Sequence, residues 1–385
     1  MSSDIQVLVL EGSARRRGQI HGETLKATIH KHIERWKHAL QKEMGLNPDE
    51  YLEQFFADTN FLPAIEKWTP DLLQEVRGIA EGAGIDFKYA LVRQLSDEET
   101  WYRFEKKVRA GGQAIERIRS QLSAENCSAI GVQAQGDKPP VVAQNMDTPA
   151  YYDGHQILLH IKDPASPVEA LVFTIAGKIS LAGLNNQGVG ICCNTLIQLN
   201  FAANGLPEDF VVRGFLARPT LDNALAFLRG VKHASGQNYV IGGPERVLDL
   251  ECSAGKICEF LPYPGADRVY HTNHPLANDD QELHKARLAK MPPDILEWYK
   301  NRQTTHARFA SLEKQLSDPT EVIDLDKIKA ALSSHDGPVC INRGTGGSIT
   351  LGCLVMELAS PPVLHLAPGP PCSTPFQTFS FDGRG

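Results

Sequence analysis

The sequence predicts a layered α+β sandwich with a helical N-terminal segment. Helical periodicity dominates residues 1–126, whereas short strand-like runs dominate residues 127–385. Strand runs and helix runs are segregated rather than alternating, which favours stacked layers over a doubly wound parallel sheet. The 385 residues are enough for one large domain or for two. We therefore expect a helical segment at 1–126 and a sandwich domain at 127–385.

In four stretches of the first part the apolar residues recur at helical spacing. We therefore expect helices at 23–43, 49–56, 70–81 and 87–122. In the first stretch the apolar residues recur every three or four positions and so share one face: Leu25, Ile29, Ile33, Trp36 and Leu40. The basic residues of the last stretch indicate a solvated face rather than a binding surface.

The second part begins with two strands, at 127–132 and 141–147, around a Gly/Asp/Pro turn. Residues 183–190 predict a hairpin rather than a phosphate-binding loop, because the G-x-G-x-x-G order is missing and a strand follows. The further strands predicted by short apolar runs are 155–162, 168–176, 189–194, 246–252, 256–261, 348–358 and 363–366.

Helices interrupt these strands at three places. Pro207 introduces a helix at 208–218, and Thr220 is placed as the N-cap of a helix at 221–232. A longer helical block covers 280–332.

Composition excludes several classes of function. The formal net charge of −7 and the absence of a basic stripe argue against a nucleic-acid partner. The N-terminus has no signal-peptide pattern, and no apolar run is long enough to span a membrane. We therefore expect a cytoplasmic protein whose partner is a small molecule, with neither nucleic acid nor membrane involved.

Cys127 is the strongest candidate for a reactive residue. It stands at the head of the first predicted strand, where a chain that cleaves itself would place a nucleophile destined to become a new N-terminus. Cleavage before Cys127 would leave a thiol and an α-amine on one residue, and the amine, with a pKa of roughly 7.7–8, could accept the thiol proton. The alternative is a packing cysteine, which is the ordinary role of a buried thiol. The other seven of the eight cysteines are interpreted in that way.

Histidines offer two competing hypotheses. His271 and His274 are three residues apart, but a metal site needs three or four ligands and no third partner is evident, so we expect no metal and no cofactor. A Cys–His dyad of Cys127 with His274 or His335 stays open, because such partners meet in the fold rather than in the sequence.

Several motifs, in order along the whole chain, resemble the acyltransferase family of N-terminal nucleophile (Ntn) hydrolases, which includes fungal isopenicillin N acyltransferase and β-alanyl-amine hydrolases. The motifs run from near the start of the chain to near its end: Gly12…Arg17-Gly18…Gly22, Asn126-Cys127, Gln144-Asn145-Met146-Asp147, Ala176-Gly177…Gly183-Leu184-Asn185-x-x-Gly188-Val189-Gly190-x-x-x-Asn194, Thr272-Asn273-His274, Pro338-x-Cys340-x-x-Arg343 and Pro368-Gly369-Pro370-Pro371-Cys372.

The resemblance implies a four-layer αββα sandwich that cleaves itself between Asn126 and Cys127 into a small and a large subunit, which stay associated. It makes Cys127 the nucleophile, Asp147 a carboxylate beside the nucleophile's amine, Asn273 an oxyanion-hole donor and Arg343 a polar residue lining the site. The bland alternatives are a turn cap for Asp147, a turn residue for Asn273 and a surface ion pair for Arg343.

Three positions depart from the fungal enzyme. Asn126 stands where that enzyme has glycine before the nucleophile, Met146 replaces an aromatic residue, and Ile175 replaces an acidic one. The penicillin substrate is therefore not transferred. We expect a self-processing cysteine amidohydrolase that cleaves a linear amide, either an N-acyl amine or an amino-acid amide, through a thioester at Cys127. The rivals are an acyltransferase that passes the acyl group to an amine, and an unprocessed binding protein.

Overall fold

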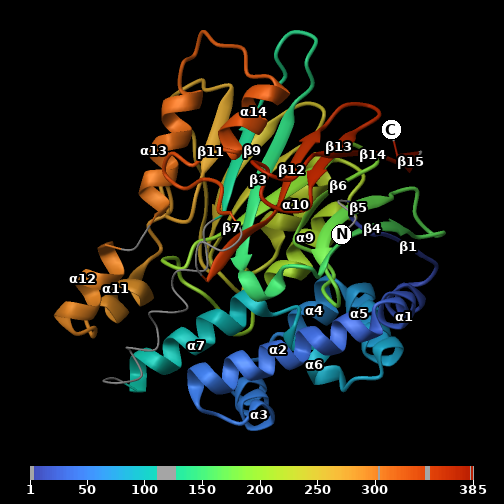
Figure 1. The fold of residues 1–385 in the computed structure, drawn as a ribbon, viewed down its shortest axis with the longest axis vertical. Coiled ribbons are helices and arrows are strands. Elements are labelled where there is room, and N and C mark those ends of the chain that lie inside the picture. Colours follow the sequence, from blue (N-terminus) through green and yellow to red (C-terminus); the bar gives the residue numbers. More distant parts are fainter. Residues whose placement is uncertain (1–3, 111–126, 302–303, 343–346, 382, 385) are drawn as a thin grey trace.

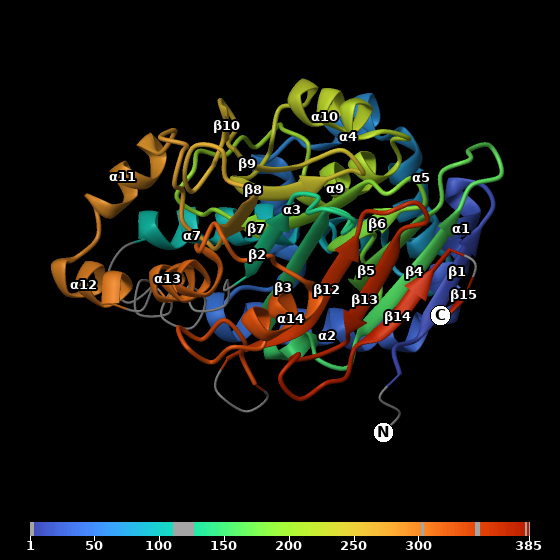
Figure 2. The ribbon, with the colours of Figure 1, turned by 90° about the horizontal axis from the view of Figure 1, so that it is seen from above.

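The computed structural model describes residues 4–110, 127–301, 304–342, 347–381 and 383–384. Two β-sheets lie face to face, and helices cover the outer side of each (Figures 1 and 2). The predicted four-layer αββα sandwich is therefore confirmed. No helix of the described ranges is long and apolar enough to cross a membrane.

The first sheet has eight strands. Adjacent strands of this sheet run antiparallel except at one edge, where β1 pairs with β4 in parallel. Every residue of β5 and β8 is buried, and strands covered on both faces have continuous apolar sequences rather than alternating ones. In spatial order the strands are β1 (Val7–Glu11), β4 (Gln156–Lys162), β5 (Ala170–Ile175), β6 (Ala182–Asn185), β7 (Gly190–Thr195), β8 (Gln237–Gly242), β9 (Val247–Cys252) and β10 (Ile257–Glu259).

The second sheet has seven strands, and all of its neighbours are antiparallel. The β2–β3 hairpin places Ser128 opposite Asn145, and β12 pairs with β3 so that Thr350 lies opposite Asp147. In spatial order the strands are β11 (Arg268–His271), β2 (Ser128–Val132), β3 (Val141–Pro149), β12 (Ser348–Glu357), β13 (Val363–Ala367), β14 (Gln377–Ser380) and β15 (Gly383–Arg384).

The helices of the described ranges form four groups. One pair, α9 (Glu208–Leu216) and α10 (Leu221–Gly230), covers the eight-stranded sheet, and another, α13 (Thr305–Leu316) and α14 (Leu325–Leu332), covers the seven-stranded one. The N-terminal helices gather at one end of the sandwich, at the bottom of Figure 1, and α11 and α12 project to one side. The remaining bounds are α1 (Ala14–Thr24), α2 (Lys26–Met44), α3 (Pro48–Asp58), α4 (Leu62–Trp68), α5 (Pro70–Ala83), α6 (Phe87–Val92), α7 (Ser96–Ala110), α11 (Glu282–Leu288) and α12 (Pro293–Asn301).

The interior is divided into two hydrophobic clusters by the seven-stranded sheet. Adjacent residues of one strand point to opposite faces, so Val142 belongs to the cluster between the sheets while Ala143 belongs to the cluster under α13 and α14. The first cluster also contains residues of α2, α5 and α9, such as Ile29, Val76 and Phe210. The N-terminal segment and the sandwich therefore share one core.

Most predicted elements are present, with three corrections. The single helix expected at 87–122 is two helices, α6 and α7, and residues 111–122 lie outside the described ranges. The block at 280–332 contains four helices, and the helix at 23–43 belongs to a pair with a break at Leu25. Apart from α1 and the central β8, the elements absent from the prediction are short or lie at sheet edges; the full set is α1, α4, β1, β8, β11, β14 and β15.

Glycines let α1 and α5 pack closely. A Cβ on Gly18 would lie 1.9 Å from the Glu75 carbonyl oxygen, and one on Gly78 would lie 2.1 Å from the Arg15 carbonyl oxygen. A side chain at either position would therefore push the two helices apart.

A buried ion group joins the same region to α9. Glu75 forms salt bridges with two arginines. Nε of Arg17 lies 3.2 Å from its Oε2, and Nη1 of Arg213 lies 3.1 Å from its Oε1. The two guanidinium groups hold the pKa of Glu75 below its usual value, although burial acts in the opposite direction. This group ties the N-terminal helices to the sandwich domain.

Candidate active site

Cys127 directly precedes β2 and lines a cavity of about 310 Å³. Its side chain is 6% exposed, and its Sγ lies 3.8 Å from the backbone oxygen of Asp147 and 3.8 Å from Sδ of Met146. Burial and then the charge of Asp147 raise the thiol pKa well above its usual value. Since the thiolate is the nucleophile, Cys127 needs an activating base before it can react.

Asp147 occupies the same cavity from β3. The residue is 4% exposed, and neither carboxylate oxygen has a hydrogen-bond partner among the described residues. Burial raises its pKa to about 7, although Thr350 and Arg308 oppose this rise. A buried carboxylate that has no ion pair among the described residues is costly, so this position is suited to a cation placed beside residue 127.

Arg308, on α13, was not predicted from the sequence, and it connects the parts of the site. Its fully buried guanidinium donates to the backbone oxygen of Cys127 and, at 3.1 Å, to Oγ of Ser128. The other terminal nitrogen donates to Oδ1 of Asn273 at 2.9 Å. Burial lowers the pKa of Arg308 to about 10, while Asp147 and Cys127 act in the opposite direction. It remains a cation at neutral pH.

Three contacts fix the orientation of Asn273, which follows β11. Besides the Arg308 contact, its Nδ2 donates to the backbone oxygen of Thr195 at 3.0 Å, and its backbone N–H donates to Oγ1 of Thr305 at 2.8 Å. A side-chain amide has two N–H groups, so one remains after the Thr195 contact. One N–H of Asn273 is therefore not used by these contacts, but Asn273 is not among the described residues that line the cavity.

The structure brings some of the predicted site residues together but not all of them. Cys127 and Asp147 share the cavity, and Asn273 connects to Cys127 through Arg308. The predictions for Asn126 and Arg343 concern residues outside the described ranges. Local sequence carries no signal for Arg308, because an arginine in a helix rich in polar residues is normally solvated.

The histidines of the dyad hypothesis point elsewhere. Nδ1 of His274 lies 2.8 Å from Oγ1 of Thr305, and burial lowers its pKa to about 3. Nδ1 of His335 lies 3.1 Å from the backbone oxygen of Cys340. None of the described residues that line the cavity is a histidine. The ring nitrogens of His271 contact Glu251 and the Thr272 backbone, so this histidine is also engaged.

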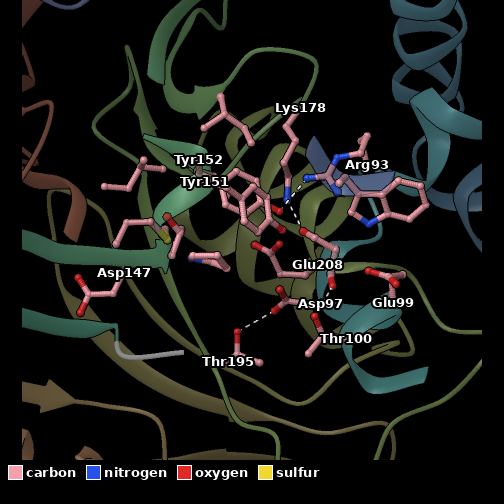
Figure 3. A pocket seen from close by; sticks show the side chains of 18 of the residues that line it. Arg93, Asp97, Glu99, Thr100, Asp147, Tyr151, Tyr152, Lys178, Thr195 and Glu208 are labelled. Carbon is pink, nitrogen blue, oxygen red and sulfur yellow. Dashed lines mark hydrogen bonds between the residues drawn. The ribbon is translucent and has the colours of Figure 1, made fainter. Parts of the chain in front are cut away.

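The cavity combines an apolar part with a charged part (Figure 3). Its apolar side chains include Trp36, Met146, Ile175, Leu181 and Leu351. Its charged side chains other than Asp147 are Arg93, Asp97, Glu99, Arg103, Lys178 and Glu208. The N-terminal helices and the sandwich therefore both contribute walls.

Most of these charges have partners. Lys178 forms a salt bridge of 3.0 Å with Asp209, and Arg103 forms one of 2.7 Å with Glu99. Asp97 is different: Oδ2 accepts from the Thr195 hydroxyl at 2.8 Å and from Gln237 Nε2 at 2.6 Å, and both donors are neutral.

Glu208 lies beside Asp97 in the cavity (Figure 3). Burial raises its pKa well above the usual value, and the charges of Asp209 and Asp97 add to this rise. The Glu208 Oε1 accepts from the thiol of Cys193 at 3.0 Å. The raised pKa favours the neutral form of Glu208, so Asp97 is the carboxylate at this end of the cavity whose hydrogen-bond donors named above are both neutral.

Comparisons with known proteins identify the family of the chain. The family model described as acyl-coenzyme A:6-aminopenicillanic acid acyl-transferase matches residues 133–361, a range that contains Asp147 and Asn273 and begins just after Cys127. No curated protein sequence matches the chain.

Two solved structures show a distant likeness. A mutant of conjugated bile acid hydrolase from Clostridium perfringens is 13% identical, with a TM-score of 0.40 over 66% of this chain and 92% of that one. Penicillin V acylase from Agrobacterium tumefaciens is 11% identical, with a TM-score of 0.35 over 66% of this chain and 85% of that one. Because the family model covers more than half of the sequence, the chain belongs to the acyl-coenzyme A:6-aminopenicillanic acid acyl-transferase family.

Proposed function

We propose that this protein is a self-processing cysteine amidohydrolase that cleaves a linear amide through a thioester at Cys127. The observation that carries the proposal is the unpartnered, buried carboxylate of Asp147 beside the Cys127 thiol. Self-cleavage would create a cation at this place, because the new α-amine of Cys127 binds a proton near neutral pH. The Asp147 carboxylate would then gain a cationic partner, which none of the described residues provides through an ion pair.

In the processing step the Cys127 thiol attacks the carbonyl carbon of Asn126. The peptide bond is replaced by a thioester, and water then hydrolyses this thioester to leave a carboxylate on Asn126 and a free amine on Cys127.

In turnover the α-amine accepts the thiol proton, and the thiolate attacks the substrate carbonyl. The negative charge that develops on the carbonyl oxygen is stabilised by the Nδ2 group of Asn273, which Arg308 holds in place. The amine product leaves with the proton that the α-amine took from the thiol. The neutral α-amine then accepts a proton from the water that attacks the thioester, and it returns this proton to the thiolate as the acid is released. Asp147 orients the α-amine whenever the amine carries a proton.

After cleavage the two fragments would remain associated. The β1–β4 pairing, the Glu75–Arg213 salt bridge and the Asp97–Thr195 hydrogen bond all join residues before 127 to residues after it. Residues on both sides also pack in the larger hydrophobic cluster and line the cavity, so separation would destroy the site.

The charged part of the cavity supports an amino-acid amide as the substrate class. An ammonium group beside Asp97 would pair with its carboxylate and would favour ionisation of the neighbouring Glu208, while the apolar walls would receive the other part of the substrate. An N-acyl amine without a charged group would leave this end of the cavity unpaired.

The test is acyl release from a panel of amino-acid amides and N-acyl amines, measured on wild type and on Cys127→Ala. We expect wild type to give two bands whose masses add up to the 42.3 kDa of the chain, with Cys127 at the new N-terminus, and Cys127→Ala to stay as one inactive band. Active protein that remains uncut would overturn the processing mechanism.

The second candidate function is acyl transfer to an amine, which shares the thioester and agrees with the activity in the family's name. Including an acceptor amine and a coenzyme A thioester in the same assay separates the two, because a transferase forms the new amide faster than the free acid. A chain that stays uncut and releases no acyl group would instead be an unprocessed binding protein.

A further inference from the structure

Cys340 and Cys372 lie close together, and neither belongs to the cavity lining. Their sulfur atoms are 3.3 Å apart, although 32 positions separate them in the sequence. A disulfide needs a separation of about 2.05 Å, so the two sulfurs have to approach by about 1.3 Å, which is within the reach of side-chain rotation. No other contact between two cysteine sulfurs is present among the described residues.

The two thiols differ in their access to solvent. Cys372 is exposed, whereas Cys340 is only 2% exposed. All eight cysteines lie in the described ranges, and among the others Cys258 is half-buried and the rest are buried. An oxidant from solution therefore meets Cys372 first, and Cys340 lies directly behind it.

We propose that Cys340 and Cys372 form a redox-sensitive pair in which Cys372 is the attacking thiol and Cys340 the resolving one. The oxidant class is a small-molecule disulfide such as oxidised glutathione. The proposal does not depend on the catalytic role of Cys127.

The reaction has two balanced steps. The Cys372 thiolate attacks one sulfur of the small disulfide, whose S–S bond breaks to release one thiol and leave a mixed disulfide on Cys372. The Cys340 thiolate then attacks the Cys372 sulfur and displaces the second thiol. The two protein thiols lose two protons and two electrons in total, and the small disulfide receives them as two thiols.

The bond would fasten the C-terminal turn to the region beside the candidate site. Ile341, the residue after Cys340, donates to Oγ1 of Thr350 at 2.9 Å and accepts from the Thr350 backbone N–H at 3.0 Å. Thr350 pairs with Asp147 across β12 and β3. The oxidised protein should therefore unfold at a higher temperature than the reduced one, because the closed loop restricts the unfolded chain.

The experiment treats the full chain with oxidised glutathione, blocks the remaining thiols and maps the peptides by mass spectrometry. We expect wild type to yield a peptide pair joined through residues 340 and 372, with little glutathione left on Cys372. In Cys340→Ser, glutathione should persist on Cys372 because the resolving thiol is gone. The Cys258→Ser variant serves as the matched control and should behave as wild type.

Because Cys340 is buried, its replacement can disturb folding, so Cys372→Ser at the exposed position provides the second test. In this variant the linked peptide pair and the rise in unfolding temperature on oxidation should both disappear, and Cys340 should stay unmodified. Glutathione that persists on Cys372 of wild type as it does in Cys340→Ser would overturn the proposal. So would modification of Cys340 in Cys372→Ser at the wild-type rate.

Discussion

Replacing Asp147 with asparagine should stabilise the uncut protein, and the gain should depend on pH. The comparison is made in a Cys127→Ala background, because a cleaved chain would present an ammonium that pairs with Asp147. The carboxyl has a pKa of about 7 in the folded chain against 3.8 for the unperturbed group, and its oxygens have no hydrogen-bond partner among the described residues. The folded state therefore resists ionisation that the unfolded state undergoes freely.

The magnitude follows from this difference in pKa. Below pH 3.8 both states keep the proton and the carboxyl imposes no penalty. Between pH 3.8 and about 7 the unfolded state is ionised and the folded state is not, so the free energy of unfolding falls by about 1.4 kcal/mol for each pH unit. Above pH 7 the full penalty of about 4 kcal/mol is present and no longer changes.

The assay is thermal unfolding of Cys127→Ala with and without Asp147→Asn at pH 5, 6, 7 and 8. We expect the asparagine variant to melt higher by a margin that widens from pH 5 to pH 7, reaching several degrees, and then stays constant. Asp137, which is exposed on the same hairpin, provides the control, and Asp137→Asn should show no such trend. A margin that is independent of pH, or a loss of stability at pH 8, would refute the reasoning.

The other predictions concern fully processed protein. Asn273→Ala should lower kcat by about 10²-fold or more, because it removes an oxyanion donor. His274→Ala should lower kcat less than tenfold. Equal losses of kcat in the two variants would support the Cys–His dyad hypothesis instead. Arg308→Gln should lower kcat by about 10- to 100-fold through the lost charge-assisted hydrogen bond to Asn273. It should also shift the acid limb of the pH–rate profile to higher pH, because the Arg308 charge lowers the pKa of Asp147 and its loss would raise that pKa. An acid limb that stays at the same pH would show that the Arg308 charge does not act on Asp147. Asp97→Asn should raise KM for amino-acid amides while leaving KM for their N-acetylated forms unchanged, and equal changes for both would remove Asp97 from substrate binding.

The exposure of the cysteines predicts the order in which a thiol reagent labels them. Cys127 is buried with a raised pKa, whereas Cys372 is exposed. Alkylation of the uncut chain should therefore begin at Cys372. In processed protein the labelling of Cys372 should leave catalysis unchanged, and inactivation should follow the labelling of Cys127 alone.

The sequence by itself determined the α+β class, most of the strands and the position of Cys127 at the head of one of them. These features follow from local patterns: continuous apolar runs such as Ala170–Ile175 predict strands buried on both faces, and Thr220 caps its helix as expected. The edge strand β1 escaped prediction because its five residues carry too short a pattern and pair with a segment some 150 positions away.

Only the tertiary structure decided what surrounds the thiol. Arg308 joins Cys127 to Asn273 across 181 and 35 positions respectively, and Asp97 reaches the cavity from a separate N-terminal helix. The raised pKa of Asp147 and the approach of Cys340 to Cys372 also arise from packing between distant segments. Local periodicity specifies which face of an element is buried, but burial, charge and proximity at a site depend on which elements meet there.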